Sequence, residues 1–277
     1  MKKTIICALL FFTVLSPVFS QEFYRRDIKY VDTATFMVWA SPNFSVQIPF
    51  GKGYLATTFE HNYSIGLDFT FKTKTNWTID VGFNYMFGSK IKKQCKDVVG
   101  DMAIEIVKDT TYAFFSGAGN NLVLLAWEGR YWNFGASFGK IIPLNRWKNS
   151  GLWLKFGMGY FGHKIYFNDT KNLFPQIALD KKKGIYYRYG YDQHASGVAL
   201  NQFFGYLFMQ KRRALSFYAG IECWEIFSKP DRGYIFVGEL KGKTDRLPRK
   251  FSGLVGFKIG WVLPFYEKTR TTTLYTF

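Results

Sequence analysis

Apolar and polar residues alternate along several stretches of the chain, and residues 251–266 show the pattern most fully. In "FSGLVGFKIGWVLPFY" the odd-numbered positions include Phe251, Val255, Phe257, Ile259 and Trp261, whereas the even-numbered positions include Ser252, Gly256, Lys258 and Gly260. Because side chains point alternately to the two faces of a β-strand, this stretch predicts a strand with one aromatic face. That face meets either a protein core or the hydrocarbon of a membrane.

The alternation recurs along the chain and predicts a series of strands. Besides 251–266 they lie at 61–73, 76–88, 131–141, 152–167, 196–209 and 214–227, and residues 121–129 add a strand whose period is ambiguous. Roughly 9–11 residues of tilted strand suffice to cross a bilayer, so these strands are long enough to do so. The count is eight, and the short link "KTN" before Trp77 predicts a hairpin. If residues 34–49 and part of 89–120 add strands, the count becomes ten.

The N-terminal residues "MKKTIICALLFFTVLSPVFSQ" have a Lys-Lys head, a short apolar middle and a small residue at Ser20. This is the pattern of a secretory signal peptide, so we expect residues 1–20 to be removed and the mature chain to begin near Gln21. A transmembrane anchor fits less well, because the apolar part is short for a bilayer. The sequence therefore predicts export from the cytoplasm.

Composition favours a membrane barrel over a soluble domain. Aromatic residues make up 20% of the chain, yet no stretch after the signal is a convincing apolar helix of about twenty residues. The predicted fold is therefore all-β, an antiparallel up-and-down transmembrane β-barrel of a Gram-negative outer membrane. Cys95 and Cys223 could pair after export, but Cys223 lies on the apolar phase of its strand, which favours a free thiol against lipid or core.

The predicted domain organisation follows from the strands. Residues 1–20 are the signal peptide, 21–60 a periplasmic segment or an extra strand, 61–266 the barrel with an insertion at 89–120, and 267–277 a tail. If the last strand runs inward, links 143–151 and 210–213 are periplasmic, and 168–194 and 228–249 lie outside the cell. Counting strands in the same way places 89–120 on the periplasmic side as a long insertion, in which "CKDVVGDMAIEIVKDT" predicts a short helix.

The polar phase of the strands places charged residues inside the barrel. They are Asp68, Asp80, Lys155, Glu222 and Lys258, and many of their neighbours on this phase are glycines. A barrel of eight strands has room inside for packed side chains and little else. We therefore expect these residues to form a charge network that neutralises itself and closes the lumen; an ion path is the alternative.

Basic residues in the links between strands indicate which partners the chain attracts. The formal net charge is +17, and basic residues gather in the links at 90–93, 180–184, 210–213 and 241–250. Such residues favour anionic lipid head groups by about 1 kcal/mol each. Nucleic acid is not an expected partner, because export separates the chain from it.

Catalytic and metal-binding patterns are weak. His61, His163 and His194 have no metal-ligand spacing with each other or with cysteine, and no complete dinucleotide fingerprint occurs, so no metal or cofactor is expected. Ser64 lies near His61 in the sequence, and Ser196 near His194, and either pair could be part of an outer-membrane lipid hydrolase. Because geometry and not sequence proximity defines such a site, the sequence predicts no catalytic residue.

Three stretches carry a resemblance to a known family: "GYFGHKIYF" (159–167), "GYDQHASGVALNQFFGYLF" (190–208) and "GFKIGWVLPFY" (256–266). They resemble small outer-membrane barrels of the PorT-like, type IX secretion-associated kind. The resemblance implies a non-enzymatic anchor, scaffold or accessory component of an envelope or secretion machine, with an envelope protein complex as partner. It transfers no active site, so a lipid-modifying enzyme and a narrow channel stay as alternatives. Tyr266 or Phe277 would supply the C-terminal aromatic residue that barrel assembly recognises.

Overall fold

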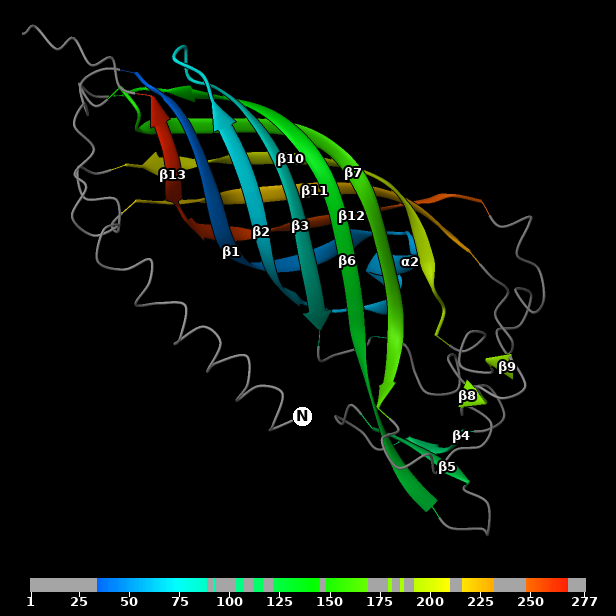
Figure 1. Ribbon diagram of the computed structural model, residues 1–277. Coiled ribbons are helices and arrows are strands. Elements are labelled where there is room, and N and C mark those ends of the chain that lie inside the picture. The colour runs from blue at the N-terminus through cyan, green and yellow to red at the C-terminus, as the bar shows by residue number, and fades with distance from the viewer. Residues whose placement is uncertain are drawn as a thin grey trace, which may run out of the picture.

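Eight long antiparallel strands close into a barrel in the computed structural model (Figure 1). In order around the barrel they are β1 (Phe36–Gly51), β2 (Asn62–Lys72), β3 (Trp77–Gly88), β6 (Leu122–Ile142), β7 (Gly151–Asn168), β10 (Ala195–Phe208), β11 (Phe217–Pro230) and β12 (Lys250–Trp261). Pairing of β1 with β12 closes the circle. The structure describes residues 34–88, 92, 103–106, 112–116, 122–144, 148–168, 179–180, 185–186, 192–209, 216–231 and 248–268. The predicted fold class is confirmed.

Alternation of side chains between two environments explains why these residues form strands. Along β1, Phe44, Val46 and Ile48 are exposed on the outer face, whereas Ser45 and Gln47 are buried inside. The same period runs through 251–261, where Phe257 and Ile259 point outward and Lys258 inward. Because each of the eight long strands pairs with a neighbour on both sides, the barrel wall that they form is closed.

The predicted set of strands was wrong in two places, although the count of eight is correct. Residues 121–129 are not a separate strand but the first part of β6, which continues without a break to Ile142. The eighth strand is instead β1, which overlaps the 34–49 alternative and lies within segment 21–60, for which an extra strand was the alternative. Pro42 and Pro49 fall inside β1, and proline weakens the sequence signal for an interior strand.

The links differ in length between the two ends of the barrel. At the short-turn end, links 73–76, 143–150 and 209–216 join the strands; at the long-loop end, links 52–61, 89–121, 169–194 and 231–249 do so. Residues 89–120 were predicted at the periplasmic end by counting strands from the last one. Because β1 is a strand of the barrel and 121–129 is not a separate strand, link 89–121 lies at the same end as the other long links. Link 73–76 is the predicted hairpin, and Asn76 adopts the left-handed conformation there with φ 65°.

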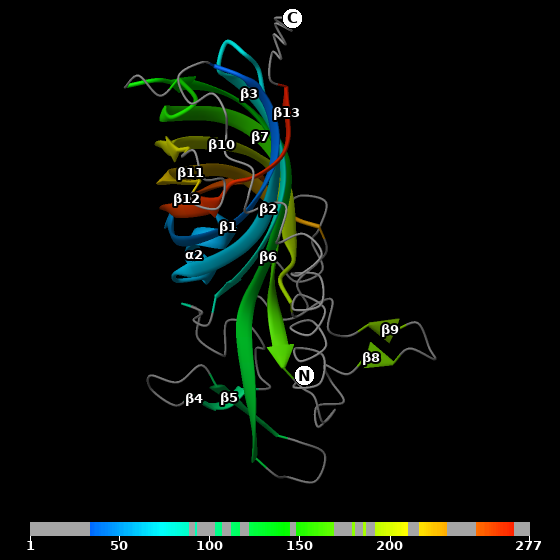
Figure 2. The same ribbon diagram turned by 60° about the vertical axis from the view of Figure 1, so that its left-hand side comes forward.

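Short strands extend the barrel wall beyond the long-loop end. β4 (Ala103–Ile106) pairs with β5 (Tyr112–Ser116), and β5 pairs with the first residues of β6, which runs past the other strands (Figures 1 and 2). The helix predicted over 95–110 is therefore wrong at 103–106, because β5, itself paired with the protruding part of β6, offers these residues a partner strand. In link 169–194, β8 (Leu179–Asp180) pairs with β9 (Ile185–Tyr186).

A short strand also follows β12 at the other end of the barrel. β13 (Leu263–Lys268) continues the direction of β12 after Val262 and pairs with the start of β1, where Tyr266 lies opposite Val38. Phe277 lies outside the described residues, as do the predicted signal peptide and Cys95.

A single helical turn covers the lumen at the long-loop end. α2 (Tyr54–Thr58) lies between β1 and β2, and Phe59 just after it packs edge-on against the inward ring of Tyr131 at 4.8 Å. Burial raises the pKa of the Tyr54 phenol, which stays protonated and donates to the Pro248 carbonyl at 3.1 Å. Among the residues that the structure describes, no helix is long and apolar enough to span a bilayer.

An apolar cluster fills the lumen at the short-turn end. Its members are Met37, Trp39, Ile141, Trp153, Phe203, Leu207, Met209, Tyr218 and Val262, all almost fully buried. Trp153 is at its centre, in edge-on contact with Trp39 at 6.0 Å and Tyr218 at 5.2 Å. The interior thus has aromatic layers at both ends and a polar layer between them.

Candidate functional site: the charged layer in the lumen

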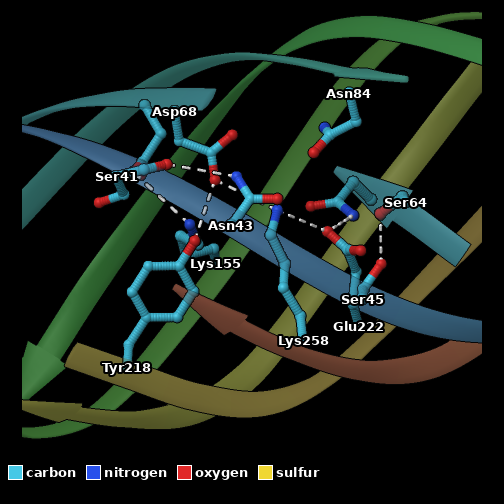
Figure 3. Close-up of polar contacts among 12 residues, drawn as sticks. Ser41, Asn43, Ser45, Ser64, Asp68, Asn84, Lys155, Tyr218, Glu222 and Lys258 are labelled. Carbon is cyan, nitrogen blue, oxygen red and sulfur yellow. Dashed lines mark hydrogen bonds and ion pairs between the residues drawn. The ribbon is translucent and has the colours of Figure 1, made fainter. Parts of the chain in front are cut away.

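The five predicted lumen residues border one small cavity in this middle layer. Figure 3 shows four of them, Asp68, Lys155, Glu222 and Lys258, with Lys258 between Asp68 and Glu222. The Lys258 ammonium group lies 3.1 Å from Asp68 Oδ2 on β2 and 3.1 Å from Glu222 Oε1 on β11. All three side chains are buried. A single cation therefore compensates two carboxylates inside the barrel.

Lys155 forms the second ion pair of the layer. Its ammonium group lies 3.5 Å from Asp80 Oδ1, and it sits 4.0 Å from the ring centre of Trp153 in a cation–π contact. Thr70 donates a 2.5 Å hydrogen bond to the same Asp80 oxygen. Lys155 thereby joins the charged layer to the apolar cluster beneath it.

Neutral side chains that the sequence analysis did not single out complete the network. Gln47 donates to Glu222 Oε2 at 3.0 Å, and Asn201 donates to Oε1 at 3.3 Å. The Tyr218 hydroxyl donates to Asp68 Oδ2 at 3.2 Å. Gln47 was missed with β1, although "NFSVQIPF" (43–50) alternates as clearly as the strands that were found. Tyr218 was on the predicted inward phase but was not assigned to the network.

A further lysine inside the barrel was also missed. Lys72 is fully buried at the short-turn end, where its ammonium group donates to the Thr35 carbonyl at 2.9 Å and to Asn149 Oδ1 at 2.8 Å. It ends the alternating pattern of β2, and its inward phase is the signal that could have found it. Lys72 thus ties β2 to the start of β1 and to link 143–150.

Glycines make the layer narrow enough for these contacts. A side chain at Gly82 would collide with the Asp68 carboxylate, and one at Gly157 would come 2.5 Å from Ser137 Cβ. The remaining cavity between the charged residues measures about 30 Å³, room for a few water molecules at most. Side chains and glycine backbone thus leave little free space between the charged residues at this level.

The structure separates one of the two Ser–His pairs and brings the other together. Ser64 points into the lumen and bonds to Ser45 at 2.5 Å, whereas the His61 ring contacts Tyr63, so this pair does not meet. Ser196 and His194 do converge, because both bind Asp231 at the long-loop end.

The convergence at Asp231 has a defined hydrogen-bond pattern. His194 Nδ1 lies 2.6 Å from Asp231 Oδ2, and the Ser196 hydroxyl donates to Oδ1 at 2.8 Å. The Tyr160 hydroxyl lies 2.6 Å from the Ser196 oxygen. The serine proton is thus directed at the carboxylate and not at the imidazole, unlike the serine–histidine relay of acyl transfer. Among the described residues no group of three or more His, Cys, Asp or Glu side chains could hold a metal ion.

The molecule is thus a closed eight-stranded barrel with an apolar outer face and a charged, packed lumen. No protein-family model matches the chain, and no curated protein matches its sequence. Solved structures with a similar backbone include Ail, the attachment invasion locus protein of Yersinia pestis, at 12% identity and TM-score 0.37. Neisserial surface protein A is similar at 9% identity and TM-score 0.38. The outer membrane protein OprG from Pseudomonas aeruginosa is similar at 11% identity and TM-score 0.37.

These likenesses extend over most of each chain. They cover 82% of this chain and 99% of Ail, 81% and 96% for the Neisserial protein, and 85% and 99% for OprG. At such low identity no residue of theirs has a counterpart that can be carried over to this chain.

Proposed function

We propose that the protein is an outer-membrane β-barrel that does not conduct and that serves as an anchor, scaffold or accessory component of an envelope or secretion machine. Membrane insertion is supported by the outer face. Large apolar side chains are exposed on all eight strands, with Phe134 at 56% and Phe257 at 55% exposure. A water-soluble surface seldom carries an apolar area of this extent.

The height of this apolar face suits a bilayer. On β3, Trp77 lies near the short-turn end and Tyr85 eight residues further along, and both are exposed on the outer face. At about 3.4 Å per residue and a tilt of about 40°, the two rings are roughly 21 Å apart along the barrel axis. Outer-membrane barrels carry an apolar band about 25 Å tall between aromatic girdles.

The main support for a barrel that does not conduct ions is the filling of its lumen by side chains. Ion pairs cross the barrel at mid-height, an apolar cluster fills the short-turn end, and α2 with Phe59 covers the other end. The experiment is planar-bilayer recording of the purified protein, for which we expect no stepwise conductance. Reproducible single-channel steps that disappear when antibody or protease removes the protein would favour the narrow channel.

An anchor or scaffold acts through contacts at its ends, and the sequence resemblance to secretion-associated barrels supports this finer proposal. A photo-crosslinking residue at exposed Lys52 samples the long-loop end, and one at exposed Lys74 samples the short-turn end. In the native envelope we expect one of the two positions to give a discrete protein complex of constant stoichiometry. If both positions yield only lipid adducts and the uncrosslinked chain, the scaffold role is wrong.

One observation favours a second candidate function, a lipid-modifying enzyme: Ser196, His194 and Asp231 meet near the lipid-exposed ring of Tyr160. To act as nucleophile, Ser196 would have to leave its bond to Asp231 and reach the imidazole. Mass spectrometry of lipids from cells that carry wild-type or Ser196→Ala protein separates the two functions. The anchor proposal expects identical acyl patterns, whereas the enzyme requires Ser196→Ala to match the deletion strain.

A further inference from the structure

Three polar side chains point outward along the boundary between β10 and β11. Gln202 on β10 lies directly opposite Cys223 on β11, and Glu225 follows two residues further along β11. All three are partly exposed and alternate with the buried, inward residues of their strands. We call this group the polar seam. Phe204 and Ile221 are exposed beside it, so the seam interrupts an otherwise apolar part of the outer face.

The polar atoms of the seam have no partner in the part of the chain that the structure describes. There, the side chains of Gln202 and Glu225 form no hydrogen bond and no ion pair. An amide that meets hydrocarbon without hydrogen bonds is costly, and polar side chains within membranes therefore pair with polar side chains of neighbouring segments. If the outer face meets lipid, the seam thus requires a partner inside the bilayer.

The stagger of the strands gives the depth of the seam. Lys258 on β12 is in register with Ser64 on β2 through β1, yet its ammonium group meets Asp68, four residues nearer the short-turn end. Residues in register therefore rise towards the long-loop end from β10 to β11, as they do from β12 to β2. At a strand spacing of about 4.8 Å and a tilt of about 40°, Glu225 lies roughly 8 Å nearer the long-loop end than Gln202, on one line parallel to the barrel axis.

A groove borders the seam on the outer face. It measures about 420 Å³, and Gln202, Phe204, Ile221, Cys223 and Phe156 contribute to its lining. Phe156 is on β7, so the groove extends from β11 across β10 to the next strand. The outer wall of a barrel is convex, and a hollow beside the seam gives the protruding side chains of a second barrel a place to pack.

We propose that the polar seam binds a second copy of this chain inside the bilayer, with the two Gln202 amides paired across a two-fold axis. Such an axis runs parallel to the bilayer normal and keeps each residue at its own depth, so a side chain near the axis meets its own counterpart. An amide suits this position because it has both N–H donors and a carbonyl acceptor. Its second N–H is left for the Glu225 carboxylate on the same line. The inference rests on the proposed membrane insertion and adds a partner to it.

Sedimentation equilibrium of the full chain in density-matched detergent micelles measures dimerisation, which we expect for wild type. Gln202→Leu should weaken it about ten-fold, equivalent to about 1.4 kcal/mol for the two hydrogen bonds of the amide pair. Glu225→Leu should cause a smaller loss, because the amide pair remains. The control Leu67→Ala changes an exposed side chain on β2, four strands from β10 in either direction, and should dimerise as wild type. Heat-modifiable gel migration establishes that each variant is folded.

Cross-linking in the native envelope identifies the occupant of the seam. In Cys95→Ser, Cys223 is the only cysteine beyond residue 20, and a short thiol-reactive cross-linker should join two copies through it. The matched control Cys95→Ser/Cys223→Ser/Leu67→Cys moves the thiol to the opposite wall and should give no dimer. Leu67 adjoins Asp68 on the long-loop side of the charged layer, as Cys223 adjoins Glu222, so the depth of the thiol is similar.

Four results would overturn the proposal. They are a Cys223 product with a different protein, a dimer from the Leu67→Cys control in place of Cys223, unchanged dimerisation of Gln202→Leu, and a larger loss in Glu225→Leu than in Gln202→Leu. The last result would mean that the carboxylate binds a cation of the partner. If wild type folds into vesicles but stays monomeric, the second copy is wrong while the membrane barrel stands. Failure to insert into vesicles would contradict the membrane barrel and the seam together.

Discussion

The Lys258 ammonium group lies 3.1 Å from the Asp68 carboxylate, although the two residues are on strands that do not pair with each other. β2 and β12 both flank β1, so this ion pair crosses the inner face of β1 and joins the first and last parts of the barrel. Glu222 on β11 binds the same ammonium group. The contact depends on barrel closure and in turn compensates charge that closure buries.

Removal of Lys258 should therefore destabilise the barrel strongly. Lys258→Ala leaves Asp68 and Glu222 buried without their cation, and breaking a buried pair in this way costs about 3–5 kcal/mol. Urea unfolding in lipid vesicles, followed by heat-modifiable gel migration, measures the loss. Lys250→Ala on the same strand is the control, because an exposed charge contributes about 0–1 kcal/mol. Equal stability of the two variants would mean that Lys258 meets bulk water.

The other members of the charged layer should behave in the same direction. Asp68→Ala, Asp80→Ala, Lys155→Ala and Glu222→Ala each remove one partner of a buried ion pair, so each should lower the free energy of unfolding. Asp80→Ala and Lys155→Ala should be non-additive in the double variant, since both act on one contact. Unchanged thermal stability of all four single variants in detergent would contradict a neutralising interior.

The apolar cluster at the short-turn end should contribute through packing. Trp153 is fully buried between Trp39 and Tyr218, so Trp153→Ala should cost about 3–5 kcal/mol by creating a cavity. The effect is expected in the same vesicle assay. Trp261→Ala, at a ring 48% exposed on the outer face, should cost less because lipid fills the space left behind. A larger loss for Trp261→Ala would mean that outer-face packing dominates.

How far the sequence predicts this fold depends on whether each strand has one polar and one apolar face. Where the faces differ, as around Phe257 and Lys258, the strand and its inward side follow directly from the alternation. β1 has the same alternation, but Pro42 and Pro49 weaken the signal for an interior strand. β6 continues through residue 130, although the period of residues 121–129 is ambiguous in the sequence. Pairing decides both cases: β6 pairs with β5 over its first residues, with β7 from Ala126 and with β3 from Gly129, so it continues through residue 130.

The charged layer in the lumen could also be predicted only as far as the alternation of each strand allows. Inward phase was enough to select Asp68, Asp80, Lys155, Glu222 and Lys258, because charged residues on that phase have only the lumen to occupy. It could not show which of them pair, since partners such as Lys258 and Asp68 meet through the relative stagger of strands distant in sequence.

Export itself is a prediction from residues 1–20, which lie outside the described residues. We expect the mature protein to begin near Gln21 and to fractionate with outer membranes. Intact-mass measurement of the protein purified from its native envelope checks the first point, and density-gradient fractionation checks the second. Retention of residues 1–20, or full recovery in a soluble periplasmic fraction, would contradict export to this membrane.

Substitutions on β12 test most directly whether lipid or water surrounds the outer face of the barrel. Ile259 is 44% exposed on the outer face, whereas Gly260 faces inward against the Tyr218 ring. If Ile259 meets hydrocarbon, Ile259→Arg should cost about 2–4 kcal/mol near the bilayer midplane, and arginine at outward positions nearer either end should cost less. Gly260→Arg should instead fail by overcrowding, without any dependence on depth.

An arginine scan over positions 253–263, with folding into lipid vesicles and heat-modifiable migration as readout, separates the two mechanisms. Outward positions should give a cost that peaks near the centre of the strand, because charge is most expensive furthest from both head-group regions. Inward positions should give a cost that follows the space available, which is smallest where a glycine faces a neighbouring side chain. A flat outward profile would mean that water and not lipid surrounds Phe257 and Ile259, and the membrane barrel would then be wrong.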